Sequence, residues 1–267
     1  MKAHQITGGP EIRPLPLLSA YRKGDVDAEL YRKQAAGEAE RVVPDLRVAR
    51  FVRTIALDDG KFTGLADDQS GSLLTFVISG EVTLASGGGT ATLVPGDLFL
   101  VDEANASRVD VKVRGDCRLV QVGVEPDWPG PGATIQNPGA QTPRDNGEIT
   151  IKRVYKGDGD DDLAYYRDFP ELFAGPRNQW SESRPGAGMR FMSWEDGFLD
   201  WHPEVVNNFA MILAGEIELQ TSGDRVTHFY HAGDICLATD KTGVGHVDCC
   251  RGYTHVALVV MDDEHLW

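Results

Sequence analysis

Short apolar runs alternate with turn residues along most of the chain. The runs are rich in Val, Ile, Leu, Phe and Thr, and Gly, Asp and Pro interrupt them at short intervals. This pattern is typical of an all-β sandwich or barrel built from short strands. Only residues 25–41 and 169–173 indicate helix, so the sequence predicts an all-β protein with few short helices.

The strand pattern occurs twice. Residues 73–102 and 208–240 both contain strand, Gly-Glu turn, strand, hairpin, strand, Gly-Asp turn and strand. The triplet Arg-Val-Asp at 108–110 corresponds to His-Val-Asp at 246–248, and the offset between the two halves stays between 135 and 138 residues. A register held over roughly 70–80 residues indicates an internal duplication and two tandem domains of one fold.

Composition suggests where these domains begin and end. Residues 1–45 contain several prolines and are expected to form an N-terminal arm, which precedes a first barrel at 46–127. Residues 128–185 begin with a Pro/Gly/Asn-rich stretch and are expected to be a linker and an irregular connecting segment. The second barrel is then expected at 186–267.

Charge and cysteine content exclude several classes of partner. The 41 acidic and 26 basic residues give a net charge of -15, and no Lys/Arg-rich run is present, so neither nucleic acid nor a membrane surface is an expected partner. No apolar run approaches the roughly 20 residues that span a bilayer, and the N-terminus lacks a signal-peptide pattern. A cytoplasmic protein is expected. The four cysteines form no CxxC pair, which predicts reduced thiols.

The repeated unit resembles the cupin superfamily. In that family the motif G-x5-HxH-x3/4-E-x6-G supplies three metal ligands, and the motif G-x5-PxG-xx-H-x3-N supplies the fourth. The resemblance covers about residues 50–125 and 188–262. It implies two tandem cupin-type β-barrels of the jelly-roll kind, a bicupin. Because cupins commonly dimerise, it also implies a homodimer, and the alternative is a tandem pair that forms a pseudo-dimer within one chain.

The second half retains part of the cupin ligand set. The motifs place His202, Glu204 and Asn208 at the three first-motif positions and His246 at the His of the second motif. If residues 202–208 are extended, alternate side chains share one face, which in a small barrel can be the interior. Such a set can hold a divalent metal ion, Fe, Mn, Zn or Ni. Hydrogen-bonded core histidines and metal-free acid/base catalysis are the alternatives.

The first half lacks these ligands. Asp67, Gln69 and Leu73 occupy the corresponding positions of its first motif, and Arg108 aligns with His246. No metal site is expected there. Arg108 is either a carboxylate-binding residue or a surface arginine.

We expect an enzyme that acts on a small molecule, because polar residues survive at the motif positions of the second half whereas the first half has lost its ligands. We expect His202, Glu204 and His246 to be catalytic, and the incomplete ligand set favours isomerase- or lyase-like chemistry on an oxygenated metabolite. A metal-dependent dioxygenase and a non-catalytic small-ligand-binding protein are the alternatives. We predict that four residues contact a substrate: Trp194, Trp201, Phe209 and Arg190. The three aromatic residues could equally pack in the core.

Overall fold

The all-β fold class predicted from the sequence is confirmed. The computed structural model describes residues 3–6, 12–15, 49–63, 65, 71–86, 89–101, 109–124, 148–194 and 197–267. In these ranges helix is limited to two short 3-10 turns, η1 (Pro170–Phe173) and η2 (Asp263–His265). The turn η1 falls on the predicted helical turn, whereas the helix predicted at 25–41 lies outside the described residues. No helix in the described ranges has the length and apolar character needed to cross a membrane.

The strands form two barrels with the same pairing pattern. The strands of the first barrel are β1 (Ala3–Ile6), β2 (Ile12–Leu15), β3 (Ala49–Leu57), β4 (Gly60–Phe62), β5 (Ser72–Ser86), β6 (Gly89–Leu93), β7 (Leu98–Val101) and β8 (Asp110–Val124). Those of the second barrel are β9 (Ile151–Lys156), β10 (Ala164–Asp168), β11 (Arg184–Trp194), β12 (Gly197–His202), β13 (Asn207–Thr221), β14 (Thr227–His231), β15 (Ile235–Ala238) and β16 (His246–Met261). In the first barrel β5 pairs with β6, β7 and β8, and in the second β13 pairs with β14, β15 and β16 in the same arrangement.

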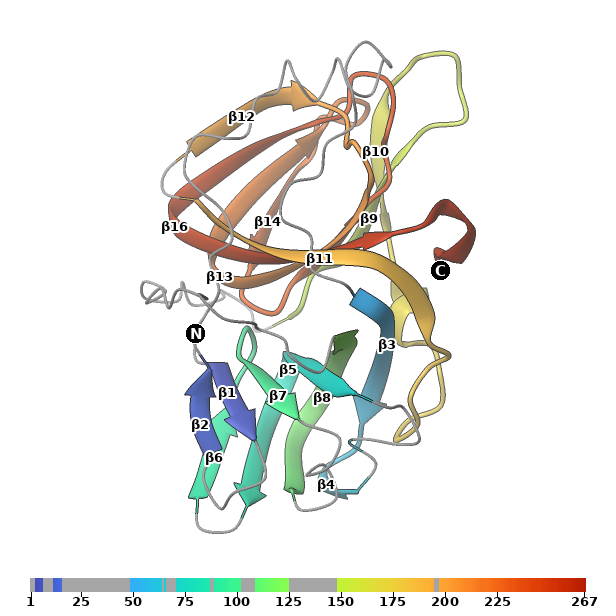
Figure 1. Ribbon diagram of the computed structural model, residues 1–267. Helices are drawn as coiled ribbons and strands as arrows, with labels where there is room; N and C mark the ends of the chain where they lie inside the picture. Colours follow the sequence, from blue (N-terminus) through green and yellow to red (C-terminus); the bar gives the residue numbers. More distant parts are fainter. Residues whose placement is uncertain are drawn as a thin grey trace.

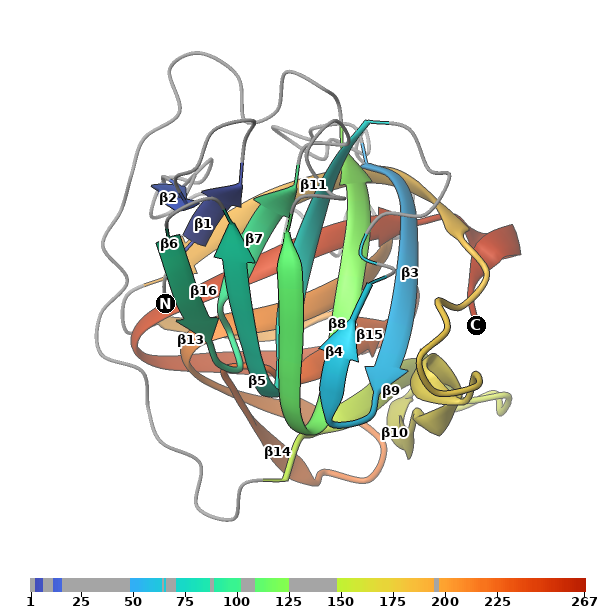
Figure 2. The same cartoon turned by 90° about the horizontal axis from the view of Figure 1, so that it is seen from below.

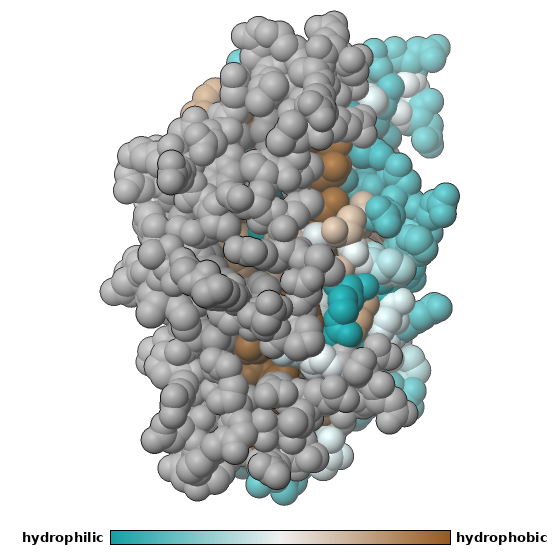
Figure 3. Space-filling view, viewed as in Figure 1, coloured by the Kyte–Doolittle hydropathy of each residue, from teal (hydrophilic) through white to brown (hydrophobic). Residues whose placement is uncertain are grey.

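Each barrel also receives a hairpin at one edge. β1 pairs parallel to β7 and antiparallel to β2, and β9 pairs parallel to β15 and antiparallel to β10. The structural repeat is therefore longer than the repeat detected in the sequence. It includes strands in the segments 1–45 and 128–185, which were expected to be an arm and a linker. The second hairpin forms a largely hydrophilic margin of the molecule, at the upper right of Figure 3.

The two barrels pack against each other through an apolar core. The start of β11 pairs with β3, at Arg184↔Val52 and Pro185↔Phe51, so one sheet continues from one barrel into the other. Figure 1 shows the second barrel above the first, and in Figure 2, seen from below, the strands of the second barrel run crosswise behind those of the first. Alternate residues of each sheet face this contact, among them Leu74, Phe76, Val120, Val122, Phe191, Phe209, Met211 and Val259.

The interiors of the two barrels differ. The first is filled mainly by aliphatic and aromatic side chains such as Val77, Phe99 and Leu119, and its buried polar side chains Arg53, Gln121 and Thr75 are joined by hydrogen bonds. The second also has an apolar part, but it contains buried histidines and carboxylates at one end. The polar end of the second barrel is where we locate the candidate site.

Candidate metal centre in the second barrel

Two histidines meet at adjacent strand ends. His202 is the last residue of β12, His246 is the first residue of β16, and the two pair in register. Their ring centroids are 4.6 Å apart, and both side chains are buried. Gly245 makes this approach possible, because its φ is +76° and a Cβ at this position would lie 1.9 Å from the carbonyl oxygen of His202. The predicted convergence of the two histidines is thus found in the structure.

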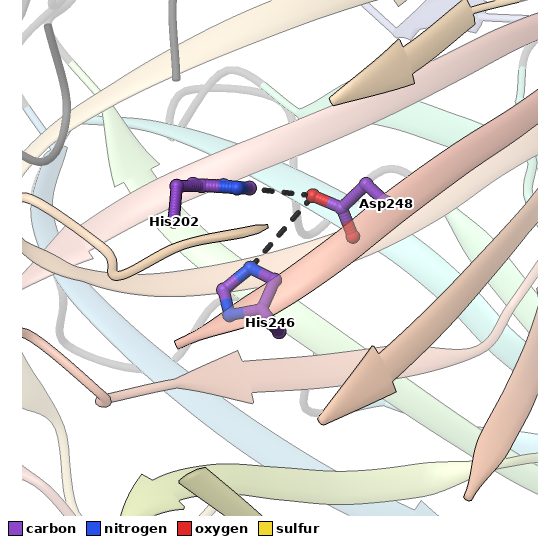
Figure 4. A group of neighbouring side chains, drawn as sticks. All are labelled: His202, His246 and Asp248. Atoms are coloured by element: carbon purple, nitrogen blue, oxygen red, sulfur yellow. Dashed lines mark ion pairs between the residues drawn. The ribbon is translucent and has the colours of Figure 1, made fainter. Parts of the chain in front are cut away.

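Asp248 completes a three-residue cluster, and Figure 4 shows its carboxylate directed at both rings. Its Oδ2 atom is 3.8 Å from His202 Nε2 and 3.7 Å from His246 Nε2. One donor atom from each residue lies within 4.8 Å of the other two. A point equidistant from three atoms so spaced is at most about 2.4 Å from each, close to metal–ligand bond lengths of about 2.0–2.2 Å.

A hydrogen bond at Nδ1 of each ring fixes the direction in which the Nε2 atom of that ring points. His202 Nδ1 donates to the carbonyl oxygen of Asp200 at 2.8 Å, and His246 Nδ1 donates to Asp240 Oδ2 at 2.7 Å. Both Nε2 atoms are therefore directed at Asp248. Metal-binding histidines characteristically have such a partner on the nitrogen that does not bind the metal.

Buried carboxylates dominate the electrostatics. Burial alone lowers the pKa of His246, but Asp240, Asp248 and Glu204 outweigh it and raise this pKa to about 10. Burial raises the pKa of Asp248, although His246 opposes the effect. Asp248 Oδ1 is buried and accepts no hydrogen bond from the described residues. The two Nε2 atoms and Asp248 Oδ2 are donors of the kind that bind a divalent cation, and such a cation would replace the proton on His246 Nε2, so the donor set fits a metal.

Glu204 reaches the cluster from a connecting segment. Its Oε1 is 3.8 Å from His246 Nε2, and its Oε2 accepts a hydrogen bond from Asn208 Nδ2 at 2.6 Å. Burial is the main cause that raises the pKa of Glu204 to about 7. Residues 202–208 do not form one extended strand, because β12 ends at His202 and β13 begins at Asn207, so strand alternation does not place Glu204 beside His202.

A cavity of about 60 Å³ lies beside these groups. All four predicted ligand residues line it, as does Arg190, one of the predicted substrate-binding residues. Polar lining is provided by Arg190, His202, Glu204, Asn208, Tyr230, Cys236, His246 and Asp248. Apolar lining is provided by Met192, Leu199, Ala210, Ile212, Ile217, Leu219, Ala238, Val256 and Leu258.

Two of the three aromatic residues that were predicted to contact a substrate do not line the cavity. Phe209 does not line the cavity, because it lies on the opposite face of β13 from Asn208 and stacks on Trp267 at 5.4 Å. Trp201 does not line it either, and the Arg225 guanidinium lies 4.5 Å from its ring centroid. The side chain of Trp194 lies outside the described residues.

The first barrel has no equivalent cluster in its described part. Leu73 is fully buried, and Asp67, Gln69 and Arg108 lie outside the described residues. Across the described ranges, the one group of three or more potential ligands is His202, His246 and Asp248.

No protein-family model matches the chain, and no curated protein matches it. Similar solved structures include a cupin 2 conserved barrel domain protein from Leptotrichia buccalis, with 12% identity, coverage of 92% of this chain and 100% of that chain, and a TM-score of 0.38. A deletion mutant of oxalate decarboxylase OxdC from Bacillus subtilis has 13% identity, coverage of 85% and 80%, and a TM-score of 0.28. Bacterial pirin YhhW in complex with nickel(II), from Escherichia coli, has 13% identity, coverage of 84% and 87%, and a TM-score of 0.30. These TM-scores are below 0.5, so the candidate site rests on the geometry of this chain.

Proposed function

We propose that the second barrel binds a divalent metal ion and catalyses proton transfer on a small oxygenated molecule, an isomerase- or lyase-like reaction. The observation that carries this proposal is the convergence of His202 Nε2, His246 Nε2 and Asp248 Oδ2 in a buried cavity that also contains Glu204. Structural histidines packed in a core would not need two further carboxylates directed at the same point.

The residues divide into ligands and a proton carrier. His202, His246 and Asp248 would hold the metal, which would act as a Lewis acid on a substrate oxygen. Glu204 would move the proton, because Asn208 holds Oε2 and leaves Oε1 on the side of the cluster. That Glu204 and Asn208 are additional metal ligands remains a prediction from the motif. The aliphatic lining would exclude water from the reacting atoms.

Metal content tests the site first. Elemental analysis and zinc or cobalt titration of the purified protein should give close to one ion per chain. His202→Ala and Asp248→Asn should abolish binding. His228→Ala is the matched control, because His228 packs edge-on against Tyr166 and does not line the cavity. Protein that stays folded and takes up none of the five metals Fe, Mn, Zn, Ni and Co would contradict the proposal.

Proton transfer is tested separately with a carbonyl probe. The metal-loaded protein should accelerate exchange of the C3 hydrogens of 2-oxobutyrate in D2O, followed by NMR. Glu204→Gln preserves the shape of the side chain and should retain the metal while losing this exchange. Equal exchange in the wild type and Glu204→Gln would remove Glu204 from the mechanism.

The ligand set favours a second candidate. Two histidines and one carboxylate are the donors found in non-haem iron oxygenases. A metal-dependent dioxygenase would consume oxygen only when loaded with iron, whereas proton exchange would persist with zinc. Oxygen-electrode measurements on anaerobically loaded protein separate the two. A protein that binds the metal and a ligand without turning over would be a non-catalytic binder.

A further inference from the structure

The cavity of the second barrel has two chemically different ends. β13 lines it twice, from Asn208 to Ile212 and from Ile217 to Leu219, and bends between them at Gly215, whose φ is +78°. Far from the bend, Asn208 is hydrogen-bonded to Glu204 and Leu219 pairs in register with Asp248, so the polar groups lie there. Positions that flank the bend carry aliphatic groups. We call the part of the cavity around Asn208 and Glu204 the polar end, and the part beside the bend, around Ile212 and Ile217, the deep end.

The deep end is a compact apolar surface. Met192, Val256 and Ile212 form one transverse row across β11, β16 and β13, and Ile217 lies on the other side of the bend. All four side chains are buried and line the cavity. Such a surface is complementary to an alkyl group, and Tyr230, which pairs with Ile217 and also lines the cavity, adds an aromatic ring and one buried hydroxyl group.

Arg190 lies between the two ends. It belongs to the row next to Met192, where it pairs with Leu258 on β16, and it is buried in the cavity wall. A guanidinium group at this depth matches the planar geometry and charge of a carboxylate. The volume of about 60 Å³ limits the size of the ligand. Since one water site needs about 10–15 Å³ on this measure, the cavity has room for about four to six water-sized groups.

We propose that the ligand of this cavity is a short-chain aliphatic carboxylate. Its carboxylate lies between Arg190 and the His202–His246–Asp248 cluster, and its alkyl chain extends into the deep end toward Ile212 and Ile217. This inference rests on the proposed function, because it takes the polar end to be the metal site. The deep end therefore selects ligands by the length of their alkyl chain.

A homologous series of carboxylates tests the inference. Zinc-loaded protein is titrated calorimetrically with acetate, butyrate, hexanoate and octanoate. Affinity should rise about fourfold for each methylene that enters the deep end, and should fall once the chain exceeds the cavity. We expect butyrate to bind best of the four. Butyrate should also bind at least tenfold more tightly than 1-butanol, since the alcohol cannot pair with Arg190.

Three variants assign the effect to named residues. Ile217→Ala enlarges the deep end and should move the optimum from butyrate to hexanoate. Leu213→Ala is the matched control, because Leu213 lies on the same strand, is equally buried and faces the core between the barrels. It should leave the optimum at butyrate. Arg190→Gln should weaken every carboxylate by a similar factor without moving the optimum.

The outcomes separate the two proposals. If zinc binds but affinity does not depend on chain length, or Ile217→Ala leaves the optimum unchanged, the ligand assignment is overturned and the metal site stands. Equal affinity for butyrate and 1-butanol also overturns it. If the wild type binds no metal, the proposed function fails, and the same series on metal-free protein decides the ligand assignment by whether butyrate remains the optimum.

Discussion

At the scale of single residues, Asp240 has the most specific role in the site. Its carboxylate is fully buried, its Oδ2 accepts the hydrogen bond from His246 Nδ1, and its carbonyl oxygen accepts one from Glu204 N at 3.2 Å. We predict that Asp240→Asn weakens metal binding about 10- to 100-fold, because it removes the negative charge that strengthens and orients the imidazole. Competition with a chromophoric chelator measures this directly.

Asp234→Asn is the control for this prediction. Asp234 is another buried carboxylate of the second barrel, and it accepts hydrogen bonds from Thr150 N and His231 N at 2.7 Å. Its substitution should lower the melting temperature while metal affinity stays as in the wild type. An equal loss of metal affinity in both variants would mean that Asp240 acts only through stability.

The sequence predicted part of this residue-scale picture. His202, His246, Glu204 and Asn208 were found through the motif, because its spacing reflects how strands return to one end of a barrel. Asp248 was missed although it follows His246 by two residues, and strand alternation places both on one face. Asp240 left no such signal, since its contact with His246 depends on how the loop between β15 and β16 folds.

At the scale of elements, the loop before β16 holds His246 in place. Val244 N donates to the carbonyl oxygen of Asp162 at 2.9 Å, and Gly245 forms a bridge with Leu163. Because a side chain at Gly245 would collide with the His202 backbone, we predict that Gly245→Ala displaces both histidines and abolishes high-affinity metal binding. Zinc titration and thermal unfolding are the measurements.

Gly252→Ala separates collision from backbone strain. Gly252 also has a positive φ of +65°, but nothing lies within 4 Å of a Cβ built there. Both variants should lose about 1 kcal/mol or more of stability from the left-handed conformation. Metal binding should survive in Gly252→Ala alone, and its loss in both would contradict the role assigned to the close approach at Gly245.

The hairpin β9–β10 shows why some elements escaped the sequence analysis. Its strands, IKRVYK and AYYRD, are short and mix charged with aromatic residues, so neither has a clear two-residue hydrophobic period. β9 joins the sheet by pairing parallel to β15, more than 80 residues further along the chain. A contact between segments so far apart leaves little trace in local composition.

At the scale of the whole molecule, the two barrels should unfold together. Phe76 of the first barrel lies 6.5 Å from Phe191 of the second, centroid to centroid, within the core that both barrels share. We predict that Phe76→Ala lowers the free energy of unfolding by about 3–5 kcal/mol and shifts one cooperative transition. Urea unfolding should give the same midpoint by circular dichroism and by tryptophan fluorescence. Two separate transitions, of which only one moves, would show that the barrels are independent.

The contrast between the two interiors has a consequence for how such a chain can change over generations. Once a strand pattern is present twice, one copy can keep a mainly apolar interior, in which Arg53 is paired with Gln121, and can supply stability. The other is then free to acquire charged groups that a lone domain of this size would tolerate poorly. A few substitutions in the interior of the second barrel can therefore give rise to new chemistry, while the interior of the first barrel keeps the free energy of unfolding above the threshold needed for a folded protein.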